Sequence, residues 1–488
     1  MPLNVKPSGH PGARQEPGRH QLLSMEKAVK FVDCDILIIG AGAAGLAAAA
    51  AVQDKEVKVI VVEKEKHVGG TTFKSGGCMW MPNNFLMQEQ GIEDSKVQGK
   101  QYVNATERTR SKTHHEDAAG DSYSLRDRRL DAFLTRGPKM IEYFRDQGFR
   151  WMATPSKFPD YRPDVEGVVD HGRTIDPVVF DAASLGGWQK YLPAPDGAPL
   201  IPRFEDLRAL TRPPLSGSRY GRLSALPTGM SRPVSMGRSL VAQLLWICQA
   251  HGNVDIWTSH ELHSLLPFNG DDSEVAGARV CYRRGNDNED KDDSNYFIDI
   301  RASQGVVLTT GGFSKNQDMR NTYVGTETLR SETAWSLAAD GDNGIALHVG
   351  RSAGASTAQL DQVWGIPTLE DPRTGKVTEA MFAIAKPFSI IVDGTGHRFL
   401  SESKPYGDVV AAMYDRARQG AGAAVFWLVF DQSYIQRYPI GSLRPIHTRT
   451  VVLDGVVNRG RILRSTTLDD LAEQMQIPGD DLRATVDN

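Results

Sequence analysis

The sequence is poor in cysteine and has no closely spaced cysteine pair. Its 488 residues include four cysteines, Cys34, Cys78, Cys248 and Cys281. The absence of a C-x-x-C pair excludes a zinc knuckle and a dithiol redox motif. We therefore expect four reduced thiols in an intracellular protein, and no metal site.

The chain also lacks an excess of one charge and a long apolar run. Lys and Arg total 56 and Asp and Glu total 60, a net charge of −4, so we expect no nucleic-acid partner. The longest apolar stretch, 36–52, contains three glycines and a run of alanines. A transmembrane helix is usually longer and richer in Leu and Ile. We expect no transmembrane segment, and the N-terminus has no apolar signal-peptide core.

Glycine, in contrast, is abundant, and buried strands alternate with helices. The 47 glycines are almost one residue in ten, against an average of about 7%. A strand at 34–39, a helix at 42–53 and a strand at 57–62 have the size of a parallel crossover. Further helices are expected at 125–148, as two helices separated by Pro138, and at 239–250. Further strands are expected at 254–258, 276–282, 296–300, 305–310, 390–392 and 424–430. The alternation predicts an α/β architecture.

The strongest motif is Gly40-Ala-Gly42-Ala-Ala-Gly45, which follows a strand and opens a helix. Gly40 permits the tight turn, Gly42 lets a pyrophosphate approach the backbone, and Gly45 lets the helix pack on the sheet. Glu63, at the end of the next strand, can accept hydrogen bonds from ribose hydroxyls. The motif alone is weak, but strand, helix, second strand and acid together predict dinucleotide binding.

A second loop rich in glycine and hydroxyl groups follows Glu63. It suits a cofactor that continues across the sheet, which favours FAD over NAD, although such loops are also ordinary turns. Its candidate cofactor-binding residues are Lys64, Gly70, Thr71, Thr72, Ser75, Gly76 and Gly77.

Residues 34–84, ending in Ser75-Gly-Gly-Cys-Met-Trp80-Met-Pro-Asn-Asn84, resemble the start of the fumarate reductase/succinate dehydrogenase flavoprotein superfamily. Within it the chain most resembles the 3-ketosteroid Δ1-dehydrogenases. The resemblance runs from about residue 33 to the end. Further matching segments are Phe158-Pro-Asp-Tyr161, Gly172-Arg-Thr-Ile-Asp-Pro177, Gly305–Phe313, Asp361-Gln-Val-Trp364 and Gly396–Tyr406.

The resemblance implies an FAD-dependent enzyme with a Rossmann-like FAD-binding domain and a second α+β catalytic domain. It divides the chain into a disordered tail at 1–32, an FAD-binding domain at 33–362 and a catalytic domain at 363–488. It adds Ala44, Thr310, Gly311 and Gly312 to the candidate cofactor contacts. Asp342 matches a family stretch that a plain turn explains almost as well, and Glu261 lies where the family contacts adenine through backbone.

In the resembled enzymes FAD takes a hydride from carbon 1 of a 3-ketosteroid, and a tyrosine removes the proton from carbon 2. That base corresponds to Tyr406, and a supporting tyrosine corresponds to Tyr161. A free phenol, with a pKa near 10, is a poor base at neutral pH. A second phenol that donates a hydrogen bond to the first favours the phenolate, which gives a physical reason for a tyrosine pair.

The resembled enzymes continue beyond Thr485-Val486 with a strand, a glycine-rich stretch beside the isoalloxazine, and two donors to the ketone oxygen. We expect this segment to be lacking here. One such donor can stabilise the transition state by roughly 3–4 kcal/mol. The loss of the segment that carries both donors would therefore impair catalysis. Three explanations stay open: the sequence is truncated, the enzyme is impaired, or the protein has taken on another role.

Three functions remain. The first is Δ1-dehydrogenation of a polycyclic 3-ketone, with the electron acceptor undetermined. The second is a related FAD-linked reductase or dehydrogenase of a small dicarboxylate, for which His397 and Arg398 form the only adjacent pair in the right region. The third is a non-catalytic flavoprotein. The acidic segment 286–295 lacks the ligand pattern of a calcium loop and is expected to be a solvated hairpin tip.

Overall fold

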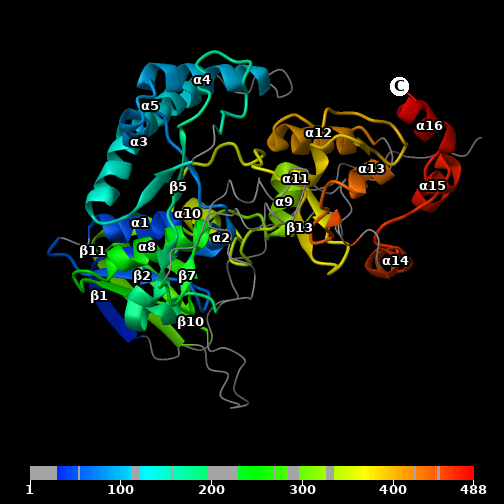
Figure 1. Ribbon diagram of the computed structural model, residues 1–488. Coiled ribbons are helices and arrows are strands. Elements are labelled where there is room, and N and C mark those ends of the chain that lie inside the picture. The colour runs from blue at the N-terminus through cyan, green and yellow to red at the C-terminus, as the bar shows by residue number, and fades with distance from the viewer. Residues whose placement is uncertain are drawn as a thin grey trace, which may run out of the picture.

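The molecule is an α/β protein built on a six-stranded sheet, with a second body of short strands and helices beside it (Figure 1). The computed structural model describes residues 30–52, 55–110, 121–154, 158–194, 229–268, 271–283, 296–325, 335–420, 425–445, 447 and 451–487. Most of the predicted tail and the acidic segment 286–295 lie outside these residues.

The main sheet has the strand order β8-β2-β1-β11-β10-β9. Strand β1 pairs in parallel with both β2 and β11, and β2 pairs in parallel with β8. Strands β10 and β9 continue the sheet antiparallel. The bounds are β1 Lys30–Ile39, β2 Val59–Val62, β8 Val254–Trp257, β9 His260–Phe268, β10 Asp271–Tyr282 and β11 Tyr296–Leu308. This sheet confirms the predicted Rossmann-like organisation.

Alternate residues of the strands enter separate cores, as the two-residue period of a strand requires. On one face Ile38, Val59 and Val61 pack with helices α1 (Ala43–Ala51) and α8 (Met236–Cys248). On the other face Leu37 and Ile60 lie in a cluster with Leu262 of β9 and with Val349 of helix α10 (Ile345–Ser352), which covers this side. A sheet covered on both faces explains why β2 reads as an uninterrupted apolar run.

Two sequence predictions are wrong in detail. Pro138 does not separate two helices, because α5 runs without a break from Asp121 to Asp146. Apolar side chains on both sides of the proline, Leu134 and Ile141, are buried, and this packing offsets the lost backbone hydrogen bond. The strands expected at 296–300 and 305–310 form one strand, β11, in which Gly305 adopts a φ of +138°.

The chain between α1 and α8 adds a small sheet, and the helices α3, α4 and α5 lie together away from the main sheet (Figure 1). This sheet has the order β3-β5-β4. The elements around it are α2 Gly70–Lys74, β3 Met79–Trp80, α3 Phe85–Glu89, α4 Lys96–Arg110, β4 Trp151–Ala153 and β5 Thr174–Pro177. A two-stranded pair, β6 (Phe180–Asp181) with β7 (Pro233–Val234), and the 3₁₀ helix η2 (Ala182–Tyr191) complete the described part of this body.

The second body is organised around the antiparallel pair β14 (Ser389–Val392) and β15 (Trp427–Phe430), which agrees with the strands predicted there. Residues of α11, α12, α15 and α16 pack against this pair, and α16 lies at the C-terminus (Figure 1). The remaining bounds are α9 Gln317–Val324, α10 Ile345–Ser352, β12 Thr368–Glu370, β13 Val377–Glu379, α11 Met381–Ile384, α12 Tyr406–Arg418, α13 Gln432–Ile435, α14 Val451–Asn458, α15 Leu468–Met475 and α16 Gly479–Asp487.

Among the described residues, no helix combines the length and the apolar character that crossing a bilayer demands.

Candidate functional site

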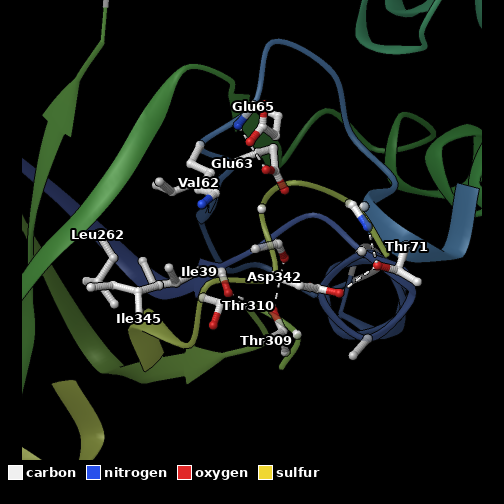
Figure 2. A pocket seen from close by; sticks show the side chains of 18 of the residues that line it. Ile39, Val62, Glu63, Glu65, Thr71, Leu262, Thr309, Thr310, Asp342 and Ile345 are labelled. Carbon is white, nitrogen blue, oxygen red and sulfur yellow. Dashed lines mark hydrogen bonds between the residues drawn. The ribbon is translucent and has the colours of Figure 1, made fainter. Parts of the chain in front are cut away.

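A cavity of about 410 Å³ opens at the carboxyl ends of β1, β2 and β11 (Figure 2). Ligands of open α/β sheets bind at such strand ends. Side chains of Ile39, Leu262 and Ile345 gather at one end of the cavity, whereas Thr71 lies at the other. The cavity is therefore apolar at one end and rich in hydroxyl and backbone groups at the other.

Most of the predicted cofactor residues line this cavity. They are Gly40, Gly42, Ala44, Glu63, Lys64, Gly70, Thr71, Thr72, Thr310 and Gly311. Five predicted residues lie outside its lining, namely Gly45, Ser75, Gly76, Gly77 and Gly312. The structure thus brings together residues from four segments of the sequence, the first and last of which, at Gly40 and Gly311, lie 271 positions apart.

The three glycines of the first loop serve different purposes. Gly40 has a φ of +103°, and a Cβ there would lie 2.5 Å from the carbonyl oxygen of Thr309. A Cβ on Gly45 would lie 1.9 Å from the carbonyl oxygen of Gly40. Both positions therefore require glycine for close packing of strand and helix. A Cβ on Gly42 would meet no protein atom within 4 Å, although Gly42 lines the cavity. The space above Gly42, at the N-terminus of α1, is shaped for a ligand.

Glu63 lies directly after β2, with its carboxylate held by backbone. Its two oxygens accept hydrogen bonds from the N–H of Ala41 at 2.9 Å and of Glu65 at 3.0 Å. Burial raises the pKa of this carboxyl, an effect that the two backbone donors partly oppose. The neighbouring Lys64 ammonium lies 4.0 Å from Glu261. A fixed carboxylate at this strand end suits the ribose hydroxyls of a dinucleotide.

The second loop is hydrogen-bonded to the Gly-Asp stretch around Asp342, a stretch that the sequence alone explains almost as well by a plain turn. The Thr71 hydroxyl donates to Asp342 Oδ2 at 2.7 Å and accepts from the N–H of Ala339 at 2.9 Å (Figure 2). A Cβ on Gly311 would lie 2.2 Å from Asp342 Oδ1. Asp342 therefore joins the second loop to the end of β11. The only sequence signal for it was the Gly-Asp stretch around it.

The loop residues outside the lining form a turn against α8. The Ser75 hydroxyl donates to the carbonyl of Thr72 at 2.8 Å and accepts from the N–H of Gly77 at 3.1 Å. Gly77 has a φ of +71°, and a Cβ there would lie 2.4 Å from the backbone of Met236. These hydrogen bonds and this close packing fix the shape of the loop.

The glycine-lined cavity fits a dinucleotide such as FAD. It has an open approach at Gly42 beside a helix N-terminus and an acid at the end of the second strand. Its apolar end, at Ile39 and Leu262, suits a ring system. These residues supply the contacts that pyrophosphate, ribose and an aromatic base each require.

The two predicted tyrosines are neighbours, although 245 positions separate them. The rings of Tyr161 and Tyr406 have centroids 5.6 Å apart and an interplanar angle of 87°. Partial desolvation, followed by the proximity of Tyr406 and Cys78, raises the pKa of the Tyr161 phenol, although 53% of the residue is exposed to solvent. The indole N–H of Trp80, three residues after the second loop, donates to Asp160 at 2.7 Å, and this bond brings Tyr161 close to the end of that loop.

Tyr406 is the first residue of α12 and has a further partner. The indole N–H of Trp364 donates to its hydroxyl at 3.0 Å. Trp364 was noted in the sequence only as part of a matching segment, and no role was assigned to it. Trp364 is 91% exposed, so a search of the sequence for buried apolar positions could not have pointed to it as a partner of Tyr406.

Comparisons with known proteins agree with this geometry. A family described as "FAD binding domain" matches residues 35–488. The 3-oxosteroid 1-dehydrogenase of Mycobacterium tuberculosis (strain ATCC 25618 / H37Rv) is 31% identical over 93% of this chain and 77% of its own length. The 4-oxocyclohexanecarboxylate 2-dehydrogenase of Sinomonas cyclohexanicum is 29% identical over 93% of this chain and 72% of its own.

A solved structure gives the same result. The 3-ketosteroid Δ1-dehydrogenase of Sterolibacterium denitrificans, in complex with 1,4-androstadiene-3,17-dione, superposes with a TM-score of 0.74 at 29% identity. The match covers 93% of this chain and 78% of that one. The fold, the dinucleotide cavity and the family match lead to one conclusion: this chain belongs to the FAD-binding domain family and is an FAD-dependent oxidoreductase related to the 3-oxosteroid 1-dehydrogenases.

Proposed function

We propose that the protein introduces a double bond between carbons 1 and 2 of a 3-ketosteroid or a related polycyclic terpenoid 3-ketone. The observation that carries this proposal is that Tyr161 packs edge-on against Tyr406, whose hydroxyl accepts from Trp364, close to the chain segment that follows the second cofactor loop. A base adjacent to a flavin cavity is what dehydrogenation next to a ketone requires. The similarity to 3-oxosteroid 1-dehydrogenases supports the substrate class.

In this proposal Tyr406 removes the proton from the carbon next to the ketone. Bound FAD supplies the acceptor for the hydride. Trp364 donates a hydrogen bond to the Tyr406 oxygen, and Tyr161, whose ring packs against Tyr406, would donate a second one; both favour negative charge on that oxygen. A phenol with an ordinary pKa near 10 keeps its proton at neutral pH, so Tyr161 can act as the donor in this pair.

We further assign the cofactor contacts proposed from the sequence. Gly42 and Ala44 would hold the pyrophosphate at the start of α1, Gly40 and Gly45 would permit the close packing behind them, and Glu63 with Lys64 would bind the ribose. Further contacts would come from Gly70, Thr71, Thr72, Thr310 and Gly311, whereas Ser75, Gly76, Gly77 and Gly312 would act by shaping the loops around the cavity. We also propose the division into an FAD-binding part, 33–362, and a catalytic part, 363–488, because Tyr406 lies in the second and the cavity in the first.

The contacts of His397 and Arg398 disfavour the alternative dicarboxylate substrate. Arg398 donates to both oxygens of the buried Glu402, at 3.1 and 2.6 Å. The His397 ring lies 3.9 Å from the carboxylate of Asp481. Both side chains therefore already face carboxylates of this chain, which argues against their use for a dicarboxylate ligand.

Anaerobic reduction of the purified protein tests the proposal. We expect a yellow protein whose visible absorbance is bleached by a 3-ketosteroid but not by 4-oxocyclohexanecarboxylate. Tyr406→Phe should abolish bleaching, whereas Tyr414→Phe, on the same helix, should leave it intact. A colourless protein, or bleaching that survives in Tyr406→Phe, contradicts the proposal.

A further inference from the structure

Tyr161 stands between two charged residues, Asp160 and Arg162, that bind different parts of the molecule. We propose that the ion pair between Arg162 and Asp408 is a positioning element that holds Tyr161 against Tyr406. The inference rests on the proposed function, because it concerns the tyrosine pair of that site.

Asp160 fixes one side of Tyr161 to the small sheet. Its carboxylate accepts from Arg173 Nη1 at 2.7 Å, from the indole N–H of Trp80 at 2.7 Å and from the N–H of Val169 at 3.1 Å. The side chains of Asp160 and Arg173 are 2% and 1% exposed. A buried charge loses stability as soon as it moves away from its hydrogen-bond partners, so Asp160 has little freedom to move.

Arg162 fixes the other side of Tyr161 to the second body. Its backbone N–H donates to the hydroxyl of Tyr102 at 3.1 Å, and its guanidinium binds the carboxylate of Asp408. Asp408 lies in the first turn of α12, two residues after Tyr406. The ion pair therefore connects the residue after Tyr161 with the helical turn that carries Tyr406, across 246 positions of sequence.

This ion pair differs from an ordinary surface pair. The side chains of Arg162 and Asp408 are only 16% and 19% exposed, so solvent screens their attraction less than at an open surface. A carboxylate in the first turn of a helix is also favoured by the helix dipole. On the same helix, the Arg418–Asp415 pair is 41% and 37% exposed and links residues three apart.

The consequence concerns rate more than substrate affinity. A proton-transfer pair must hold its geometry to a fraction of an ångström, and a 1 Å displacement can cost about 100-fold in rate. Without the ion pair, Tyr161 remains bound to its own body through Asp160 but is no longer held at α12. We expect kcat to fall while KM changes little.

The test uses Arg162→Gln, Asp408→Asn and the charge-exchanged double variant Arg162→Asp/Asp408→Arg in the flavin-loaded protein. Each single variant should lower kcat for the 3-ketosteroid at least about tenfold and change KM less than about threefold. The double variant should recover part of the loss, because the restored ion pair is offset by an arginine in the first turn of α12, where the helix dipole disfavours a cation. Asp415→Ala, which removes the neighbouring surface pair, should retain the kcat of the unmodified protein.

Hydrogen–deuterium exchange tests the same inference without substrate. We expect faster exchange in peptides covering 158–170 and the first turn of α12 in both single variants, restored in the double variant and absent in Asp415→Ala. Unchanged exchange and kcat in the single variants, or no recovery in the double variant, would overturn the inference. If no 3-ketosteroid reduces the flavin of the unmodified protein, the proposed function is wrong. The exchange data then still decide whether the ion pair positions Tyr161.

Discussion

The indole N–H of Trp364 donates a hydrogen bond to the hydroxyl of Tyr406 at 3.0 Å, although the Trp364 side chain is 91% exposed. An exposed indole has little structural reason to adopt one position, so the bond points to a role at the tyrosine. A donor to this oxygen stabilises the charge that arises when the tyrosine is ionised.

Trp364→Phe should lower kcat about 10- to 100-fold. This range corresponds to the loss of a hydrogen bond to a charged group, which contributes roughly 1.5–3 kcal/mol. It keeps an aromatic face but removes the donor, so KM should be nearly unchanged. Steady-state kinetics with a 3-ketosteroid measure both quantities. Trp246→Phe on α8 is the matched control. A raised KM with a normal kcat would instead make Trp364 part of the substrate surface.

Gly42 and Gly45 should respond in opposite ways to the same substitution. In Gly42→Ala the new methyl meets no protein atom within 4 Å but enters the cofactor cavity. Its apoprotein should melt normally and retain little FAD. In Gly45→Ala the methyl would lie 1.9 Å from a carbonyl oxygen, so the apoprotein should lose about 1–3 kcal/mol of stability or more. Visible absorbance per chain and thermal unfolding of the apoprotein separate the two effects.

The sequence was informative wherever a residue's conformation depends on its immediate neighbours. The turn at Gly40, the helix after Gly42 and the buried strand before Glu63 follow from local sterics and apolar pattern. The continuous helix through Pro138 was missed because burial on both sides of the proline is a tertiary effect. Local propensity cannot report that effect.

Long-range polar contacts were the part that the sequence could not supply. The Thr71–Asp342 hydrogen bond joins residues 271 positions apart, and the Arg162–Asp408 ion pair joins residues 246 apart. Neither partner has a pattern of its own, since charged and hydroxyl side chains in loops are usually solvated. Only the assembled fold shows which of them meet.

Glu63 should make the stability of the apoprotein depend on pH. Burial raises the pKa of this carboxyl above its usual value near 4.5, so the folded state binds the proton more tightly than the unfolded state. The resulting stabilisation is present below pH 4.5 and is lost as the pH rises through the folded-state pKa. Glu63→Gln should remove this component. Urea unfolding of both proteins from pH 4 to 7 gives the comparison, and identical pH slopes would contradict the assignment.

Arg173 should be among the most sensitive positions for stability, because it neutralises two buried carboxylates. It donates to both oxygens of Asp94 at 2.9 and 2.7 Å and to Asp160 at 2.7 Å. Arg173→Met leaves these carboxylates buried without their cation, which costs about 3–5 kcal/mol when one partner of such a pair is removed. Chemical denaturation measures the loss. The surface variant Arg418→Met should cost less than about 1 kcal/mol, and an equally small loss in Arg173→Met would show that water reaches the cluster around Asp160.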